Sequence, residues 1–472
     1  MNTIQISVET QQIINAELAN SYGIVPKAED ENGITFFIDE SMVFDTIEKE
    51  LELILGRKVL LIESESDLVK KALLIYYRQG EAKPRGVNGA EKFEVNSQDF
   101  LEKLIHEAKS IGCSDIHLEV YRHECRVRYR IDGKLIIKYK IEGEDYLEIV
   151  NKIKIKSHID ITEKRLPQDG RISYDDFDIR VSILPTLYGE KIVMRILGRD
   201  SDHLNIDKLG MMPIEKERYL EALKSSKGII LLSGPTGSGK TTTLYSSLKL
   251  LNKPDINILT VEDPIEYTLK GINQVQLRED IGLSFNSTLR SFLRQDPDVI
   301  MLGEIRDKST AEMAIRLSLT GHLVLSTIHT NSATGTISRL VDMGIPSFLI
   351  AETLIISVAQ RLLRKLCNSC KIETNFVAEE FPLGMFADLN THWKACGCED
   401  CYFTGYKGRT AIYEIIPMDN QLGQKIKKNE LDLEDYIAKR KYSRLSDQAL
   451  DLVKTGSTSM EEVYSIIVES NR

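Results

Sequence analysis

Residues 231–243 read Leu-Leu-Ser-Gly-Pro-Thr-Gly-Ser-Gly-Lys-Thr-Thr-Thr and contain the pattern G-x-x-x-x-G-K-[ST], from Gly234 to Thr241. The apolar residues 229–232 just before it predict a buried strand, and residues 242–249 just after it predict a helix. A strand, a glycine-rich loop and a helix in this order are the context in which the pattern binds phosphate groups. The glycines allow backbone N–H groups to turn towards the phosphates, and the start of the helix adds partial positive charge.

The pattern predicts a site for ATP and Mg²⁺. Lys240 is expected to reach the β- and γ-phosphates, and the Thr241 hydroxyl is expected to bind Mg²⁺. A glycine-rich turn with a chance lysine is the alternative, which the surrounding strand and helix disfavour. The residues expected to contact the nucleotide are Gly234, Pro235, Thr236, Gly237, Ser238, Gly239, Lys240, Thr241 and Thr242.

The composition is that of an ordinary globular chain. Its 472 residues suggest about three domains, and 42% of them are hydrophobic and 28% charged. The net charge of −10 disfavours a protein that coats nucleic acid, because the overall electrostatic term would be repulsive. The first residues lack the features of a signal peptide, and no run of about 18 apolar residues occurs. We therefore expect a cytoplasmic protein whose membrane contact, if any, is peripheral.

Four segments are expected along the chain. Residues 1–78 predict a small N-terminal domain, and residues 79–94, rich in glycine and charge, predict a linker. Residues 95–200 predict an α+β domain. In residues 201–472, strands and helices alternate as in a parallel sheet, which predicts an α/β domain with an insertion at about 365–405.

The helices and strands are expected from their periodicity, caps and turn residues. The expected helices are Gln11–Tyr22, Asp45–Leu55, Ser66–Arg78, Ser97–Ile111, Tyr146–Ile159, Thr242–Lys249 and Thr310–Leu319. The expected strands are Ile34–Ile38, Val59–Ile62, Cys125–Ile131, Lys134–Lys140, Phe177–Ser182, Ile192–Ile196, Ile229–Leu232, Ile256–Val261, Val299–Leu302 and Leu323–Thr327. Asp132-Gly133 predicts a hairpin turn, and a capping box of Ser309 with Glu312 is expected to start the helix that Gly321 ends.

Acidic residues follow two of the strands expected near the glycine-rich loop. Glu262, Asp263 and Glu266 follow one strand, and Glu304 follows another. Carboxylates at the carboxyl ends of parallel strands can bind Mg²⁺ or orient an attacking water molecule. We expect Glu262 and Glu304 to be catalytic and Asp263 and Glu266 to contribute to nucleotide binding. A helix N-terminal acid or a surface charge is the alternative for each, and it has most weight for Asp263 and Glu266.

Two histidines flank the strand expected at Leu323–Thr327. A histidine of this kind is more often a hydrogen-bonded structural residue. His329 follows the strand and could sense the γ-phosphate, so it is a better candidate for catalysis than His322, which precedes the strand.

Two pairs of cysteines have the C-x-x-C spacing of a structural zinc site. The expected zinc ligands are Cys367, Cys370, Cys398 and Cys401. The segment between the pairs is longer than usual, and Cys396 could compete for a ligand position or be spare. Four reduced thiols without metal are the alternative.

Taken together, these stretches resemble the secretion ATPases that drive type II secretion and type IV pilus assembly. The matching segments near the loop are GPTGSGKTTTLY, VEDPIEY, LRSFLRQDPDVIMLGEIRD and TGHLVLSTIHTN. In the second domain they are SDIHLE at 114–119, RYRIDG at 128–133, RLPQDGR at 165–171 and RVS at 180–182. The resemblance extends from about residue 97 to the C-terminus.

The resemblance implies a RecA-like P-loop NTPase domain joined to a PAS-like domain and assembled as a homo-hexamer, with ATP between the domains. It makes Arg171, Arg180 and Arg195 candidates to reach the phosphates, although they could be ordinary arginines of a strand face. It associates Glu304 with Mg²⁺ and hydrolysis and places His322 and His329 in the histidine box of the family, so His322 is expected to contribute to nucleotide binding. It also supports zinc at the cysteines, and it implies that the N-terminal domain docks on the cytoplasmic part of a membrane platform protein.

The sequence also bears on several alternative functions. Retraction ATPases of the superfamily generally lack the cysteine insertion, so its presence favours assembly or export over retraction. A RecA-like motor on nucleic acid would need a basic, aromatic-lined channel, and the acidic balance weighs against it; no nucleic-acid partner is expected. A nucleotide-gated scaffold is disfavoured because Lys240, Glu262 and Glu304 are all in place.

Overall fold

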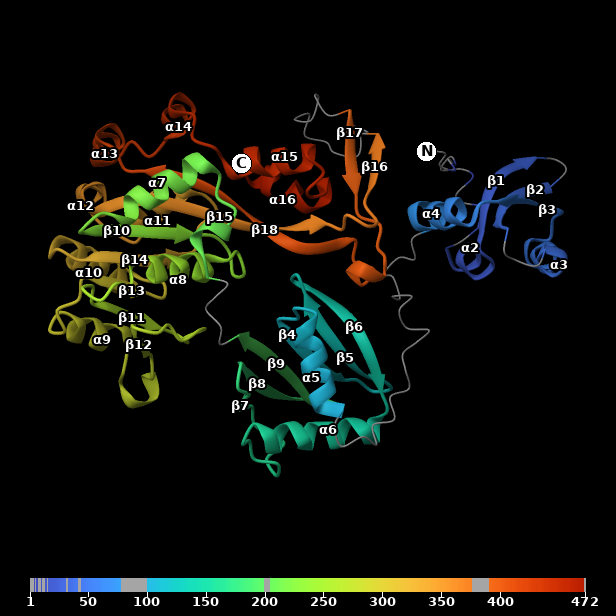
Figure 1. Ribbon diagram of the computed structural model, residues 1–472, viewed down its shortest axis with the longest axis horizontal. Coiled ribbons are helices and arrows are strands. Elements are labelled where there is room, and N and C mark those ends of the chain that lie inside the picture. The colour runs from blue at the N-terminus through green and yellow to red at the C-terminus, as the bar shows by residue number, and fades with distance from the viewer. Residues whose placement is uncertain are drawn as a thin grey trace. The chain divides into compact units, whose positions relative to one another are not determined.

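A computed structural model describes residues 16–30, 33–40, 44–77, 100–198, 204–375 and 390–470, together with a few single positions before residue 16. These residues form an N-terminal domain, a middle domain and a C-terminal domain (Figure 1). The linker expected at 79–94 lies outside the described residues. No helix among the described residues is both long and apolar enough to cross a membrane.

The N-terminal domain has a three-stranded sheet in the order β1-β2-β3, with β1 antiparallel and β3 parallel to the central strand. Its strands are β1 (Ile24–Asp30), β2 (Gly33–Asp39) and β3 (Val59–Ser64), and its helices are α2 (Ala16–Tyr22), α3 (Phe44–Leu55) and α4 (Ser66–Tyr76). Alternate residues of β2 are buried, which is why its pattern was readable. The predicted strands and the later two helices are confirmed. β1 was missed because Pro26 and its charged second half hide the alternation.

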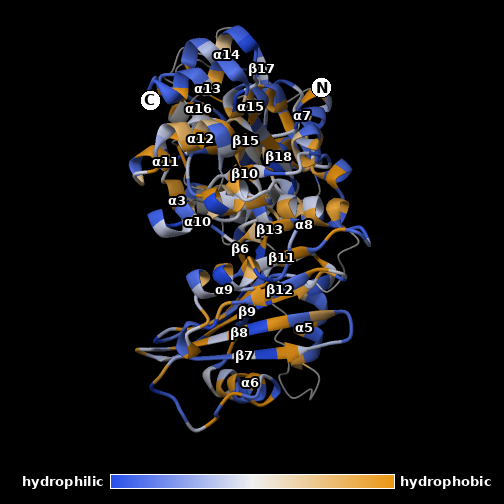
Figure 2. Ribbon diagram, turned by 90° about the vertical axis from the view of Figure 1, so that its left-hand side faces the viewer, coloured by the Kyte–Doolittle hydropathy of each residue, from blue (hydrophilic) through white to orange (hydrophobic). Residues whose placement is uncertain are grey.

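The middle domain has a six-stranded antiparallel sheet in the order β6-β5-β4-β9-β8-β7. Its strands are β4 (Asp115–Val120), β5 (Cys125–Ile131), β6 (Lys134–Ile141), β7 (Gln168–Ser173), β8 (Phe177–Thr186) and β9 (Gly189–Gly198), and its helices are α5 (Phe100–Ser110) and α6 (Gly143–Lys156). Apolar and polar segments alternate along its strands (Figure 2). The predicted turn at Asp132-Gly133 is confirmed, with positive φ at both residues. β4 was missed because polar and charged residues alternate with its apolar ones, and β7 was missed because Ile172 is its only apolar residue.

The C-terminal domain is built on a seven-stranded sheet in the order β12-β11-β13-β14-β10-β15-β18 (Figure 1). Its strands are β10 (Gly228–Ser233), β11 (Ile258–Glu262), β12 (Asn273–Gln276), β13 (Val299–Leu302), β14 (Leu323–Ile328), β15 (Leu354–Leu366) and β18 (Tyr406–Pro417). All neighbours are parallel except β18, which runs antiparallel to β15. The predicted parallel sheet is therefore confirmed for its central strands, and the antiparallel edge is an addition.

Helices pack on both faces of this sheet, as two buried apolar clusters show. The helices are α7 (Pro213–Leu223), α8 (Lys240–Leu251), α9 (Phe285–Phe292), α10 (Lys308–Leu319), α11 (Ala333–Asp342), α12 (Ser347–Thr353), α13 (Asn420–Lys427), α14 (Glu434–Arg440), α15 (Leu445–Lys454) and α16 (Met460–Ser470). A small hairpin of β16 (Ile372–Asn375) and β17 (Thr391–Lys394) lies between β15 and β18 in the chain.

The predicted capping box of α10 is wrong. The N-cap is Asp307, whose side chain accepts a hydrogen bond from the Thr310 N–H at 2.8 Å. Ser309 lies inside the helix, and Glu312 forms an ion pair with Lys308. An aspartate two residues earlier thus caps the helix, because Asp is as good an N-cap as Ser.

Candidate functional site

The glycine-rich loop connects β10 to α8 at the carboxyl end of the central strands. Gly237 and Gly239 have φ angles of 79° and 90°, a region that glycine adopts without steric cost. A Cβ atom on Gly239 would also lie 2.8 Å from Nε2 of Gln360, whereas one on Gly237 would meet nothing within 4 Å. Both glycines are therefore required by the backbone, and Gly239 is required by packing as well.

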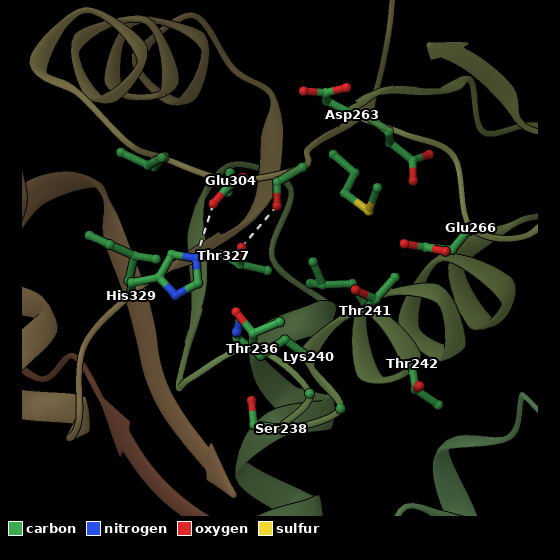
Figure 3. Close-up of a pocket in the computed structure, with 18 of the residues that line it drawn as sticks. Thr236, Ser238, Lys240, Thr241, Thr242, Asp263, Glu266, Glu304, Thr327 and His329 are labelled. Atoms are coloured by element: carbon green, nitrogen blue, oxygen red, sulfur yellow. Dashed lines mark hydrogen bonds and ion pairs between the residues drawn. The ribbon is translucent and has the colours of Figure 1, made fainter. Parts of the chain in front are cut away.

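A pocket of about 790 Å³ opens beside this loop (Figure 3). A volume of this size suits a nucleotide-sized ligand. The predicted residues that line it are Thr236, Gly237, Ser238, Gly239, Lys240, Thr241, Thr242, Glu262, Asp263, Glu266, Glu304 and His329. Thr241 and Glu304 thus present a hydroxyl and a carboxylate to the same space, and oxygen atoms of this kind are the ligands that Mg²⁺ prefers. The residues present fit a Mg²⁺–nucleotide.

Lys240 is held by the loop itself. Its Nζ donates hydrogen bonds to the carbonyl oxygens of Gly234, at 2.8 Å, and Pro235, at 2.9 Å. Burial lowers the pKa of Lys240 to about 8, against a smaller opposing effect of the Glu304 carboxylate. The ammonium group is therefore mostly charged at neutral pH, as contact with phosphates requires.

Glu304 follows β13 and is bonded to two cationic or protonatable side chains. His329 Nε2 lies 3.1 Å from Glu304 Oε2 (Figure 3), and Arg306 forms an ion pair with the other carboxylate oxygen. Burial raises the pKa of Glu304, but Arg306 and His329 together outweigh it and lower the pKa below its usual range. Glu304 is therefore an ionised carboxylate at neutral pH, and it lies just beyond the carboxyl end of β13.

Glu262 is buried at the end of β11 and is hydrogen-bonded by three neighbours. Thr260 Oγ1 donates to it at 2.6 Å and Gln274 Nε2 at 3.1 Å, and the Tyr245 hydroxyl donates to its second oxygen. These bonds fix the carboxylate between α8, β11 and β12. Glu262 thus differs from Glu304 in that its polar contacts come from neutral groups.

His322 lies at the opposite end of β14 from His329, away from the pocket. Its Nδ1 is 2.8 Å from the carbonyl oxygen of Leu317 and 3.0 Å from Thr320 Oγ1, at the end of α10. These contacts support a structural role for His322. They do not support a role in nucleotide binding, which stays a prediction.

The three candidate arginines belong to strands of the middle domain. Arg171 forms an ion pair with Asp178, at 2.5 Å, and Arg195 one with Asp115, at 2.8 Å. Arg180 donates a hydrogen bond to the carbonyl oxygen of Ile265. Among the described residues that line the pocket, the three arginines do not occur. Their contact with the phosphates remains a prediction.

Several pocket residues were missed from the sequence. They are Leu244, Pro264, Tyr267, Phe285, Met301, Gly303, Ile305, Arg306, Thr327, Ile328, Arg339, Met343, Leu362 and Arg409. Arg306 is two residues after Glu304 in the sequence, and this short spacing could have identified Arg306 as a pocket residue. Arg409 had no local signal, because only the return of β18 to the sheet brings it to the pocket.

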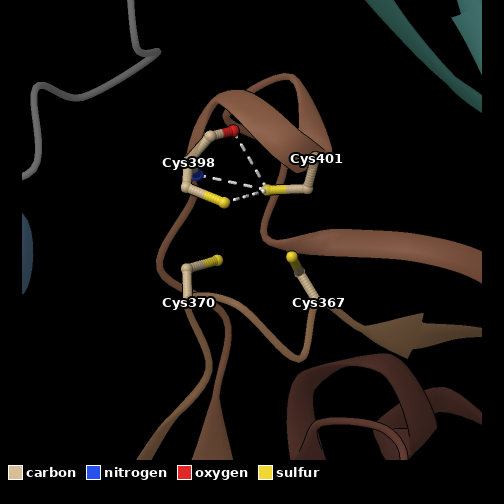
Figure 4. A group of neighbouring side chains, drawn as sticks. All are labelled: Cys367, Cys370, Cys398 and Cys401. Atoms are coloured by element: carbon tan, nitrogen blue, oxygen red, sulfur yellow. Dashed lines mark hydrogen bonds between the residues drawn. The ribbon is translucent and has the colours of Figure 1, made fainter.

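The four predicted cysteines converge. One sulfur atom from each of Cys367, Cys370, Cys398 and Cys401 lies within 4.8 Å of the others (Figure 4). The Sγ atoms of Cys398 and Cys401 are 3.8 Å apart. Sulfur atoms that bind one tetrahedral zinc ion at about 2.3 Å are about 3.8 Å from one another. The cluster therefore fits a structural Zn²⁺. The cysteines that would bind it follow β15 and precede β18 in the sequence.

Comparisons with known proteins agree with this geometry. A family model described as "Type II/IV secretion system protein" matches residues 91–465. The chain belongs to this family. It is 38% identical over 485 residues to the type IV pilus assembly ATPase PilB of Myxococcus xanthus, and the alignment covers 96% of this chain and 85% of that protein.

A second curated protein and a solved structure are also similar to this chain. The chain is 42% identical over 381 residues to the type II secretion system ATPase E of Vibrio cholerae, and the alignment covers 79% of this chain and 75% of that protein. The crystal structure of the pilus retraction motor PilT with bound ADP is similar with a TM-score of 0.54 and 27% identity, over 77% of this chain and 96% of that chain. The chain is accordingly an ATPase of the secretion and pilus-assembly kind.

Proposed function

We propose that this ATPase powers the assembly of a type IV pilus. The observation that carries the proposal is the extent of the match to PilB of Myxococcus xanthus, which covers 96% of the chain. The match to the type II secretion ATPase of Vibrio cholerae covers 79%. The chain thus shares with PilB of Myxococcus xanthus a region that extends beyond the part it shares with the secretion protein, and beyond the 78% that is matched by PilB of Pseudomonas aeruginosa.

In this proposal the pocket of the C-terminal domain performs the hydrolysis. Lys240 moves from the carbonyls of Gly234 and Pro235 to the phosphates, while Glu304 orients the attacking water and His329 holds Glu304 in place. Mg²⁺ held by Thr241 and Glu304 would neutralise the charge of the β- and γ-phosphates. Glu262, through its three hydrogen bonds, keeps the end of β11 in register beside the nucleotide.

Arg171, Arg180 and Arg195 are proposed to complete the site from a PAS-like middle domain. A second pocket supports this for two of the three, because Arg171 and Arg180 line it together with Glu266 and Tyr267, which also line the nucleotide pocket. Charge developing on the transferred phosphate is a standard target for an arginine that arrives from elsewhere. A homo-hexamer, as the family resemblance implies, would supply such arginines from adjacent subunits.

The proposal places the chain in the cytoplasm at the face of the plasma membrane. The N-terminal domain would dock on the cytoplasmic part of a platform protein, as the family resemblance implies. Zn²⁺ at the cysteine cluster would act as a structural cross-link and take no part in the reaction.

Steady-state ATP hydrolysis, measured with oligomer mass in parallel, tests the enzymatic part. We expect Mg²⁺-dependent turnover in a hexamer-sized species that Glu304→Gln abolishes. Glu312→Gln is the matched control, because Glu312 lies on the exposed side of α10 and pairs only weakly with Lys308, at 3.8 Å. Turnover that requires DNA, or that survives Glu304→Gln, would contradict the proposal.

Deletion of the gene in its source organism tests the choice of pilus. Surface filaments, counted by electron microscopy, should disappear and return with the wild-type gene, but not with the gene for Glu304→Gln. Loss of secreted proteins with filaments retained would instead favour the second candidate, type II secretion, which the 42% identity to the Vibrio cholerae protein supports. Excess filaments in the deletion strain would indicate retraction.

A further inference from the structure

Two adjacent residues of β15 lie beside the nucleotide-binding loops but do not line the pocket. β15 runs parallel to β10, with Val358 opposite Leu232 and Ala359 opposite Ser233. The next two residues, Gln360 and Arg361, therefore continue past the end of β10, where the glycine-rich loop begins. Because successive side chains of a strand point to opposite faces, one residue faces α8 and the other faces the opposite side of the sheet.

Gln360 supports both ends of the glycine-rich loop. A Cβ atom on Gly234 would lie 2.4 Å from the backbone oxygen of Gln360, and one on Gly239 would lie 2.8 Å from its amide nitrogen. The side-chain oxygen of Gln360 accepts a hydrogen bond of 2.9 Å from Thr243, in the first turn of α8. Gln360 is only 2% exposed, so a buried polar group is committed to these contacts.

Arg361 faces the loop that contains His329. Its guanidinium donates a hydrogen bond of 3.1 Å to Oδ1 of Asn331, two residues after His329. At the first residue of α11, directly after this loop, the carbonyl oxygen of Ala333 accepts a hydrogen bond of 2.8 Å from the hydroxyl of Ser357 on β15. The N–H of Ala333 donates to the buried carboxylate of Glu414 on β18 at 2.7 Å. The loop after β14 is thus fixed by β15 and β18.

From these contacts we propose that Gln360 and Arg361 are positioning residues, which hold the glycine-rich loop and the His329 loop in register with each other across β15. Phosphate binding depends on the first loop, and in the proposed function the orientation of Glu304 depends on the second, through His329. The inference rests on that proposed function for its effect on turnover, but not for its effect on structure. A displacement of about 1 Å between such groups is enough to cost about 100-fold in rate.

Removal of the Arg361 contact should affect turnover and spare ATP binding. We expect Arg361→Met to lower kcat by about 100-fold with KM nearly unchanged, because the His329 loop loses its register while the glycine-rich loop keeps Gln360. Arg361→Lys keeps a donor and should restore part of kcat. Asn331→Ala removes the same hydrogen bond from an exposed position and should reproduce the loss without a risk to folding.

Arg364→Met is the matched control. Arg364 lies on the same strand and is also mostly buried, but its ion pair is with Glu462 of α16, away from the nucleotide loops. Its loss should lower Tm and leave kcat of the folded protein unchanged. Equal losses of kcat in Arg361→Met and Arg364→Met would mean that both arginines are merely structural and would overturn the inference.

The test of Gln360 uses nucleotide affinity, which does not depend on turnover. Gln360→Met should weaken binding of a non-hydrolysable ATP analogue by about tenfold, since one buried hydrogen bond to α8 is lost. Unchanged affinity in this variant, or wild-type kcat in Asn331→Ala, would overturn the proposal. If the wild-type protein hydrolyses no ATP, the proposed function fails, but the affinity of Gln360→Met still decides the part that concerns the glycine-rich loop.

Discussion

The nucleotide pocket and the cysteine cluster are both recognised by short motifs, but they are built differently. In the pocket, the glycine-rich loop and the acids follow buried strands of one sheet, and the charged groups are bonded to other protein groups. In the cluster, two pairs of cysteines come from the ends of two antiparallel strands and meet through their sulfur atoms. We infer that the sheet fixes the geometry of the pocket, whereas an ion held by the four cysteines would add to the stability of the cluster.

The largest expected effect concerns the pocket. Lys240→Ala should weaken ATP binding by about 1000-fold, about 4 kcal/mol, because two charge-assisted hydrogen bonds to phosphate are lost. Tm should remain near that of the wild-type protein, since the sheet holds the loop. Equilibrium binding of a fluorescent nucleotide checks the affinity, with Lys249→Ala at the exposed end of α8 as the control. A large fall in Tm with Lys240→Ala would break the distinction between the two regions.

The cysteine cluster should show the opposite behaviour. Replacement of Cys398 and Cys401 by Ser should abolish zinc binding, measured by elemental analysis, and lower the stability of the region around β16 and β17 by about 3 kcal/mol. Nucleotide affinity should change little. Hydrogen exchange resolves the two regions within one sample. Cys396→Ser is the matched control, because Cys396 is outside the cluster of four, and loss of zinc in that variant would assign it as a ligand.

The two histidines that flank β14 give an internal comparison. His329→Ala should lower kcat by about 100-fold, or about 2.7 kcal/mol, because Glu304 loses its partner at 3.1 Å. His322→Ala should leave kcat unchanged and lower the free energy of unfolding by about 1 kcal/mol, through its hydrogen bonds at the end of α10. Steady-state kinetics and thermal unfolding separate the two outcomes, and the reverse pattern would contradict the assignment.

A buried acid outside both sites should show the smallest effect. Burial raises the pKa of Glu215 from 4.5 to about 6, against the hydrogen bonds from Met212 and Gln448. The folded state then binds the proton more tightly than the unfolded state. Proton binding by Glu215 therefore stabilises the folded state fully below about pH 4.5, and this stabilisation is lost as the pH rises through about 6. The free energy of unfolding that is lost in this way is about 2 kcal/mol.

Denaturant unfolding between pH 4 and pH 7 tests this expectation. The free energy of unfolding should fall with rising pH by that amount more in the wild-type protein than in Glu215→Gln. Equal slopes in the two proteins would contradict the raised pKa. Glu304, whose pKa is lowered by Arg306 and His329, should show no such loss in this range of pH.

The sequence predicts those features whose signals are local. The glycine-rich loop, the acids after β11 and β13 and the cysteine pairs are each written in a few consecutive residues, so their positions could be stated before the fold. β4 was not predicted, because Asp115, His117 and Glu119 are polar yet buried among charged neighbours of the adjacent strands. Here tertiary pairing, which no local pattern records, satisfies the charges.

The part of the candidate site that comes from β15 and β18 was also beyond the sequence. Gln360 and Arg361 interrupt an apolar run and suggest only that the run does not cross a membrane. Their contacts with Thr243 and Asn331 span more than a hundred residues in one case. Arg409 reaches the pocket for the same reason, since the antiparallel return of β18 places it there.

The cysteine cluster also bears on how the chain tolerates changes in length. Cys367 donates its N–H to Gly405, beside the last paired residues of β15 and β18, so the cysteines sit where the two strands diverge. The ends of the segment between Cys370 and Cys398 are thus fixed together at its base. Doubling a loop whose ends are already joined costs only about 0.6 kcal/mol. Insertions or deletions in that segment should therefore leave the register of β15 and β18, and with it the nucleotide site, unchanged.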